Sequence, residues 1–150
     1  MVLSQKFERK TNSNSTNLYR SLRRINPSPY LFHLKFDEFD IIGSSPEMMV
    51  NVNQKVVNIR PIAGTRKRGA NDKEDALLSE DLLADEKERA EHLMLVDLGR
   101  NDVGKVSEIG SVKVTEFMSI EKYSHVMHIV SNVVGKLSSS HDNFDALMSG

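Results

Sequence analysis

The stretch EKERAEHLMLVDLGRND, residues Glu86–Asp102, decides how the chain around it folds, because a strongly charged half runs directly into an apolar half. On a helix, Glu88 and Glu91 are three residues apart and project from one face. Glu91 stands where the charged half meets the apolar run Leu93–Val96. A carboxylate at the edge of a buried region must be paired, protonated or given a cation. The stretch therefore predicts a long helix with an acidic face that needs a partner and an apolar run that anchors it in the core.

A solvated helix face is the alternative explanation for the same charges, and runs of charge are more often of that kind. Three pairs have the i,i+4 spacing at which side chains meet on a helix surface: Asp85 with Arg89, Lys87 with Glu91, and Glu88 with His92. The helix alone does not separate a surface face from a binding site, so the other segments have to decide.

The composition is typical of a soluble globular protein, with 39% hydrophobic and 27% charged residues. At 150 residues the chain is long enough for one domain. Its net charge of −1 gives no electrostatic reason to expect a nucleic acid or an anionic membrane as partner. The absence of cysteine excludes disulfides and thiolate metal sites. No apolar run approaches the roughly 20 residues that span a bilayer, and no signal peptide is evident, so we expect a cytoplasmic protein.

Alternating and β-branched patterns predict strands, and polar capping residues predict the helices between them. Both ends are abrupt, because a strand begins at the first residue and a helix has barely begun when the sequence stops. We therefore expect a fragment of a longer protein. The expected strands are residues 1–7, 30–36, 39–42, 48–52, 55–59, 112–117 and 123–137; the expected helices are residues 16–24, 72–83, 86–102 and 143–148; residues 61–65 are expected to form a tight loop and residues 104–110 a turn.

The segment GTRKRG, Gly64–Gly69, has the glycine spacing of a phosphate-binding loop but lacks the Lys-Ser/Thr pair that reaches the phosphates and magnesium. An NTPase site is therefore rejected. A small-residue loop with a hydroxyl and adjacent cations suits a carboxylate-bearing small molecule, while a plain surface turn is the alternative.

The other candidate side chains are one acid and two histidines. Glu47 follows Ser-Pro and could serve as an acid, although an acid there also suits the first turn of a helix. On a helix, His125 and His128 could share a metal, but the β-branched residues around them favour a strand, which sends them to opposite faces. A zinc site is therefore not expected.

These segments together resemble one family closely, the chorismate-utilising enzymes, and within it the catalytic subunits of anthranilate synthases. Any one of these motifs would be weak evidence for the family. Several long motifs in the family's order and at its approximate spacing are very specific. The motifs are VLSQKF (residues 2–7), YRSLR (19–23), NPSPY (26–30), GSSPE (43–47), RPIAGTR (60–66), DEKERAEHLMLVDLGRND (85–102) and YSHVMH (123–128).

The resemblance implies an α+β fold in which two antiparallel β-sheets pack as a sandwich with helices outside. Residues 1–150 would then be part of a chorismate-binding catalytic domain, truncated at both ends. It also implies the magnesium-dependent conversion of chorismate and ammonia to anthranilate and pyruvate, a lyase reaction of tryptophan biosynthesis. Ammonia would come from glutamine through an amidotransferase subunit or fused domain. The family's second magnesium-binding glutamate lies beyond residue 150, so we expect the isolated chain to be inactive.

The matching positions imply the following roles. Glu91 would be a Mg²⁺ ligand and Glu88 a nearby acid of the metal's surroundings, while Gly64 and Thr65 would hold substrate. Glu47 would protonate the departing 4-hydroxyl, and His128 would be an active-site histidine of open role. The site where tryptophan binds as feedback inhibitor would include Pro29, Tyr30 and Leu31.

Three alternatives remain. Many aminodeoxychorismate synthases carry an attacking lysine where this chain has Ala63, so Ala63 favours anthranilate synthase. The lysine base of isochorismate and salicylate synthases would fall before Met1, outside this sequence. A small module that binds anions through the cations of residues 66–68 is the alternative that is not an enzyme.

Overall fold

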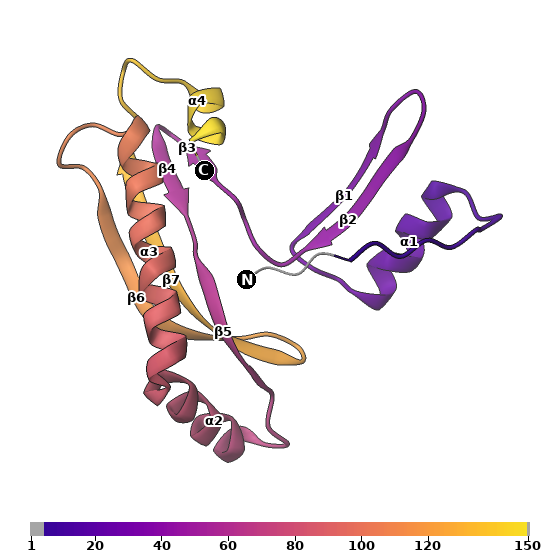
Figure 1. Cartoon of the computed structure of the whole chain (residues 1–150), viewed down its shortest axis with the longest axis horizontal. Helices are drawn as coiled ribbons and strands as arrows, with labels where there is room; N and C mark the ends of the chain where they lie inside the picture. The colour runs from indigo at the N-terminus through magenta and orange to yellow at the C-terminus, as the bar shows by residue number, and fades with distance from the viewer. Residues whose placement is uncertain (1–4, 150) are drawn as a thin grey trace. The chain divides into compact units, whose positions relative to one another are not determined.

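The structure is a computed structural model that describes residues 5–149, and the chain divides into two compact units, Met1–Pro46 and Glu47–Gly150. The first unit contains a two-stranded antiparallel sheet and the second a five-stranded one (Figure 1). The predicted α+β class with two antiparallel sheets is therefore confirmed. The sandwich packing of the two sheets stays a prediction.

The first unit is a helix, α1 (Ser15–Ile25), packed on a hairpin of β1 (Tyr30–Lys35) and β2 (Asp40–Ser45). Asn14 caps α1, because its side chain accepts a hydrogen bond from the Asn17 N–H. The helix and hairpin were predicted, and the helix begins one residue before its predicted start at residue 16. The predicted strand at residues 1–7 is wrong for residues 5–7, which form no strand, and its first four residues lie outside the described range.

The apolar residues that alternate along β1 lie on the more exposed face of the hairpin. Tyr30, Phe32 and Leu34 are 45%, 38% and 49% exposed, while Leu31 and His33, on the other face, are half-buried. The α1 helix contacts this second face, where the rings of Tyr19 and His33 lie 5.7 Å apart. Alternation shows which residues share a face. Which face is covered depends on where the helix packs.

The second unit is built around the long central strand β7 (Val126–Lys136), which was predicted as a strand. Strands β4 (Val56–Ile59) and β5 (Ile62–Lys67) pair antiparallel with successive halves of β7, and β6 (Lys113–Lys122) also pairs with it. The short β3 (Asn51–Asn53) pairs with β4 through a turn at Gln54 and Lys55, whose positive φ angles of 50° and 64° fit a type I′ hairpin.

Three helices complete the second unit: α2 (Asp72–Ala84), α3 (Glu86–Val106) and α4 (Asn143–Met148). Asn71, Asp85 and Asp142 cap them through hydrogen bonds to backbone N–H groups. Figure 1 shows α3 running along the sheet, and it contacts β4, β5, β6 and β7. Its buried side forms one helical stripe of spacing three and four: His92, Val96, Gly99, Val103 and Val106.

This stripe corrects two predictions about the opening stretch. The helix continues through Gly104 to Val106, because Val103 and Val106 extend the buried stripe into the core formed with Val133 and other residues. The run Leu93–Val96 is only partly an anchor. Val96 is 2% exposed, but Leu93 and Met94 are 46% and 63% exposed because they project away from the stripe.

Candidate active site at the β5 bulge

The predicted loop at residues 61–65 is instead the start of β5, and it contains a β-bulge. Ala63 pairs with Ile129 and Arg66 with Met127, so Gly64 and Thr65 together stand opposite the single residue between those partners. Gly64 has φ 66°, which only glycine adopts readily. Sequence reasoning took the small residues as a turn, whereas they kink a strand that stays paired on both sides of the kink.

The residue opposite the bulge is His128. Its Nδ1 lies 2.8 Å from the carbonyl oxygen of Gly64 and 3.1 Å from Oγ1 of Thr65. A carbonyl oxygen only accepts, so Nδ1 must carry the proton in this arrangement. In the neutral ring the lone pair then lies on Nε2. The bulge thus brings together three predicted site residues and fixes the tautomer of the histidine.

Glu88 approaches the same bulge from α3. A Cβ atom at Gly64 would lie 3.3 Å from Oε2 of Glu88 and 3.1 Å from Cδ1 of Leu82, so the glycine keeps space open in front of the carboxylate. Glu88 is half-buried, and Glu91, three residues further along the helix, is exposed. Both carboxylates project from neighbouring positions on one helix face, as predicted.

These two acids fit the chemistry of a magnesium site. Mg²⁺ is usually held by one or two carboxylates together with water and substrate oxygens. Within residues 5–149 no group of three or more acidic, histidine or cysteine side chains is placed to hold a metal ion by itself. A pair of carboxylates is the usual protein contribution to a Mg²⁺ site whose other ligands are water or substrate oxygens.

Arg66 provides the positive charge next to these acids. It bonds Asp81 at 2.7 Å and Asp85 at 3.0 Å, and its Nη1 lies 4.0 Å from Oε1 of Glu88. The pKa of Asp85 is lowered, first by the Glu88 N–H that it caps and then by Arg66. The i,i+4 spacing of Asp85 and Arg89 gives no ion pair here, because the Asp85 carboxylate is held by Arg66 of β5, a distant partner that the helix sequence cannot specify.

The i,i+4 spacing of Glu88 and His92 also gives no pair, because His92 points into the core. His92 is fully buried, and its Nε2 lies 2.7 Å from Oγ of Ser131 on β7. The same hydroxyl accepts a hydrogen bond from the Met118 N–H at 2.9 Å. Burial lowers the pKa of His92, so the ring is neutral at physiological pH and offers no charge to Glu88. This histidine joins α3 to the sheet.

Glu47 lies at a separate hollow of about 170 Å³. Its neighbours there include Met48, Arg60, Leu98 and Asp102. Glu47 is exposed, and its negative charge adds to the rise in the pKa of Tyr123. Hydrogen-bond distances join Gly64 and Thr65 to His128, and the Glu88 carboxylate lies next to Gly64, whereas Glu47 is related to this group through its electrostatic effect on Tyr123.

Tyr123 is a site residue to which sequence reasoning gave no role. Its ring meets that of His128 edge-on, with 5.4 Å between centroids. Its hydroxyl donates to Oε2 of Glu121 at 2.8 Å, and Arg60 forms an ion pair with the same carboxylate. Burial, followed by the hydrogen bond to Glu121, raises the pKa of Tyr123 to about 12. Its position next to a histidine motif was the only sequence signal.

The remaining predicted residues lie elsewhere. His125 is exposed in the turn before β7, with Nδ1 2.8 Å from Oγ of Ser124. Pro29, Tyr30 and Leu31 belong to the first unit, where Pro29 precedes β1 and the other two begin it. Their role in tryptophan binding stays a prediction. Within residues 5–149, no helix combines the length and the apolar character needed to cross a membrane.

Comparisons with a family model, with related sequences and with solved structures all give the same family. A family model described as chorismate binding enzyme matches residues 1–149. The anthranilate synthase component 1 of Aquifex aeolicus is 58% identical over 147 residues, which are 98% of this chain and 30% of that protein. The protein of the same name from Acetivibrio thermocellus is 58% identical over 149 residues, 99% of this chain and 30% of its own length.

A solved structure supports the same fold. The crystal structure of anthranilate synthase component I from Streptococcus pneumoniae superposes with a TM-score of 0.81 at 46% identity, over 93% of this chain and 30% of that one. This chain therefore spans about 30% of the length of the curated relatives that it matches.

Proposed function

Because this chain belongs to the chorismate binding enzyme family, we propose that it forms part of the catalytic subunit of an anthranilate synthase. The reaction is the conversion of chorismate and ammonia to anthranilate and pyruvate. The observation that supports it most directly is the β5 bulge, where Gly64 stands between the Glu88 carboxylate and the His128 ring. Identity of 58% to proteins named anthranilate synthase component 1 supports this member of the family.

In this proposal Glu91 and Glu88 hold Mg²⁺, which when bound polarises the ring carboxylate of chorismate. Gly64 and Thr65 line the substrate, since the absence of a side chain at Gly64 leaves room next to Glu88. Further Mg²⁺ ligands would come from parts of the catalytic subunit outside this chain. Arg66 keeps the cluster of acids from repelling one another when no cation is present, through its contacts with Asp81 and Asp85.

Glu47 and His128 are the proposed proton-transfer groups. Loss of the 4-hydroxyl as water requires a proton, which Glu47 donates. His128 has its Nδ1 proton committed to the Gly64 carbonyl, so in the neutral ring Nε2 is the atom that can accept a proton or a hydrogen bond. This assigns an accepting role to a histidine whose role the sequence left open.

The partners follow from the same proposal. A glutamine amidotransferase subunit or fused domain would supply ammonia, and tryptophan would bind as feedback inhibitor at Pro29, Tyr30 and Leu31. The enzyme would be a cytoplasmic lyase, or an organellar one if its source is a plant.

A second candidate, aminodeoxychorismate synthase, is weaker because of one residue. Ala63 pairs with Ile129 immediately before the bulge and has no amine that could attack the ring. Anthranilate synthase needs no such lysine, since ammonia itself attacks. Isochorismate synthases are a less favoured alternative.

The test is magnesium-dependent turnover of chorismate by the complete catalytic subunit with ammonia. We expect Glu91→Gln to reduce kcat by at least about 100-fold, since second-shell losses alone cost 10–100-fold. Glu86→Gln, an exposed acid in the first turn of the same helix, is the matched control and should retain activity. Unchanged magnesium-dependent turnover in Glu91→Gln would refute the metal assignment.

A further inference from the structure

The hydroxyl of Tyr123 is fixed by a chain of charged groups from strand β6 and from the connection between β4 and β5. It donates to Glu121, which stands directly opposite His128 in the pairing of β6 with β7. Arg60, between β4 and β5, pairs with this carboxylate and also lies 3.3 Å from Glu116. Side-chain hydrogen bonds that involve a charged group are the stronger kind. The phenol end of the ring is therefore held in place.

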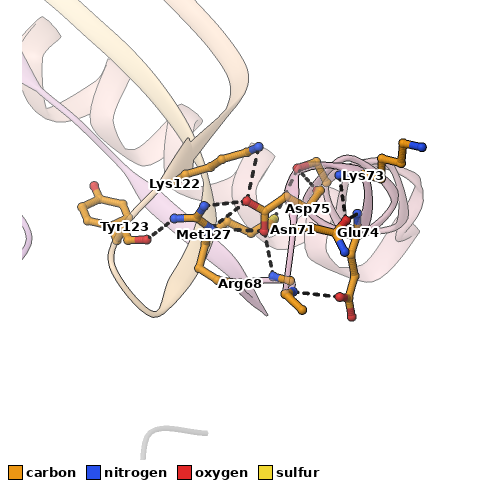
Figure 2. Close-up of polar contacts among 11 residues, drawn as sticks. Arg68, Asn71, Lys73, Glu74, Asp75, Lys122, Tyr123 and Met127 are labelled. Carbon is orange, nitrogen blue, oxygen red and sulfur yellow. Dashed lines mark hydrogen bonds and ion pairs between the residues drawn. The ribbon is translucent and has the colours of Figure 1, made fainter.

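The backbone of Tyr123 is fixed independently. Arg68 donates from Nη1 to the Tyr123 carbonyl at 2.8 Å (Figure 2). The backbone N–H of Arg68 donates to the His125 carbonyl at 3.1 Å. Arg68 thus bridges both sides of the turn between β6 and β7. Any movement of this turn would carry the Tyr123 ring with it, so the arginine sets where the ring can lie.

Arg68 is itself immobilised by Asp75, a side chain of α2 that is 1% exposed. Nε and Nη2 of Arg68 bond both carboxylate oxygens, with Nη2 2.6 Å from Oδ2 (Figure 2). The Gly69 N–H donates to Oδ1 at 2.7 Å, and the Lys122 ammonium lies 3.5 Å from Oδ2. A two-pronged guanidinium–carboxylate contact fixes direction as well as distance. The turn is therefore tied to α2.

We propose that Tyr123 is the positioning residue for His128, held at its hydroxyl by Glu121 and Arg60 and at its backbone by Arg68 and Asp75. The hydrogen bonds at Nδ1 fix one side of the imidazole. They do not by themselves prevent rotation about the Cβ–Cγ bond that would exchange Nδ1 with a ring carbon. The edge-on Tyr123 ring opposes that rotation and keeps the Nε2 lone pair in one direction.

The functional importance of this arrangement rests on the proposed role of His128, but the arrangement can be tested without substrate. Nitrogen-15 NMR at a pH above the titration of imidazoles distinguishes the two neutral tautomers, because a single tautomer gives two widely separated ring-nitrogen shifts. We expect His128 to show the Nδ1–H pattern. In Tyr123→Phe we expect the separation between the two shifts to fall by about half or more.

A second tyrosine–histidine contact in the same chain provides the matched control. Tyr19 and His33 have ring centroids 5.7 Å apart in the first unit, and their interplanar angle is 32° rather than 64°. Tyr19→Phe should leave the His128 shifts as they are in the unaltered chain. Glu121→Gln should act in the same direction as Tyr123→Phe, and it decides the question if Tyr123→Phe does not fold.

A His128 separation unchanged in the folded Tyr123→Phe variant would overturn the proposal, since a merely structural tyrosine would alter thermal stability without altering the tautomer. In the complete catalytic subunit the same variant should lower kcat for chorismate with little change in KM. If the unaltered subunit does not turn over chorismate, the proposed function fails while the NMR result still decides the positioning role.

Discussion

Helix α3 meets the five-stranded sheet differently at its two ends. At its C-terminal end, Val103 and Val106 pack in an apolar core, and a Cβ at Gly135 of β7 would come within 2.6 Å of Val103 and 2.3 Å of Ser107 Oγ. At its N-terminal end, the contacts are polar: Glu88 faces the Gly64 bulge, and His92 bonds Ser131. Each end has a strand glycine near the helix. Gly135 is required because a side chain there would clash with the helix, and Gly64 is required because its backbone conformation is left-handed.

The C-terminal end of α3 therefore stabilises the unit through apolar packing, and the N-terminal end carries the polar groups of the candidate site. Apolar packing needs only shape and volume, whereas each buried polar group at the other end needs a partner in a defined direction. A polar end is therefore more sensitive to the loss of one atom. The following variants test that comparison, from the largest expected effect to the smallest.

Ser131→Ala should have the largest effect. It leaves two buried groups, the Met118 N–H and Nε2 of His92, without the hydroxyl that both contact. Each unsatisfied buried group costs about 1–3 kcal/mol, so we expect a loss of about 3 kcal/mol in the free energy of unfolding, measured by urea titration. Ser140→Ala, in an exposed loop, should change it little. A loss below about 1 kcal/mol would show that water replaces the hydroxyl, and the polar end of α3 would then not depend on this one side chain.

Gly135→Ala tests the apolar end. The added methyl group meets Val103 and Ser107 at less than van der Waals distance, and we expect a loss of about 2 kcal/mol, typical of overpacking. Gly104→Ala is the control, because nothing lies within 4 Å of its Cβ position and alanine favours a helix by roughly 0.5–1 kcal/mol. Equal unfolding free energies for the two variants would contradict the close approach of α3 to β7.

Gly64→Ala should cost about 1–2 kcal/mol, because its φ of 66° is left-handed. Its second effect distinguishes it from Gly135→Ala. The methyl group would crowd Glu88, so we expect weaker magnesium-dependent activity in the complete subunit and a changed His128 tautomer by nitrogen-15 NMR. If Gly135→Ala altered the tautomer as strongly, the two ends would not be functionally distinct.

The pH dependence comes last, because it leaves stability at neutral pH unchanged. Arg68, and then the Gly69 N–H, hold the pKa of Asp75 well below its ordinary value of 3.8. The folded state therefore binds this proton less tightly than the unfolded chain, so the stabilisation is complete above pH 3.8 and is lost as pH falls toward the folded pKa. Thermal unfolding measured across this range should show a weaker dependence on pH in Asp75→Asn. An identical dependence in both proteins would place the acid sensitivity at other carboxylates.

Local signals predicted much of the fold correctly. The starts of α2, α3 and α4, predicted at residues 72, 86 and 143, and the turn between the predicted strands 48–52 and 55–59 depend on residues two to four apart, so short stretches of sequence specify them. The β-branched run likewise predicted the central strand β7. The bulge in β5 was missed because glycine and threonine after a proline are equally compatible with a turn.

The candidate site was predicted in part, through motifs. They led to Gly64, Thr65, Glu88 and His128, which the structure brings together, and to Glu91, which follows Glu88 on the same helix face. They gave no role to Tyr123 or to the pair Arg68 and Asp75, because nothing in their local sequence indicates which distant group each contacts.

The sequence by itself determined where α2, α3 and α4 begin, that β7 is a strand, and which family of motifs the chain carries. Only the tertiary structure decided that His128 stands opposite Gly64 and Thr65, more than sixty residues away, and that α3 covers one side of the sheet with Val96 rather than Met94. The physical reason is that caps and alternation are set by neighbours in the chain. Strand register and helix rotation are set by which surfaces fit together once the whole unit has folded.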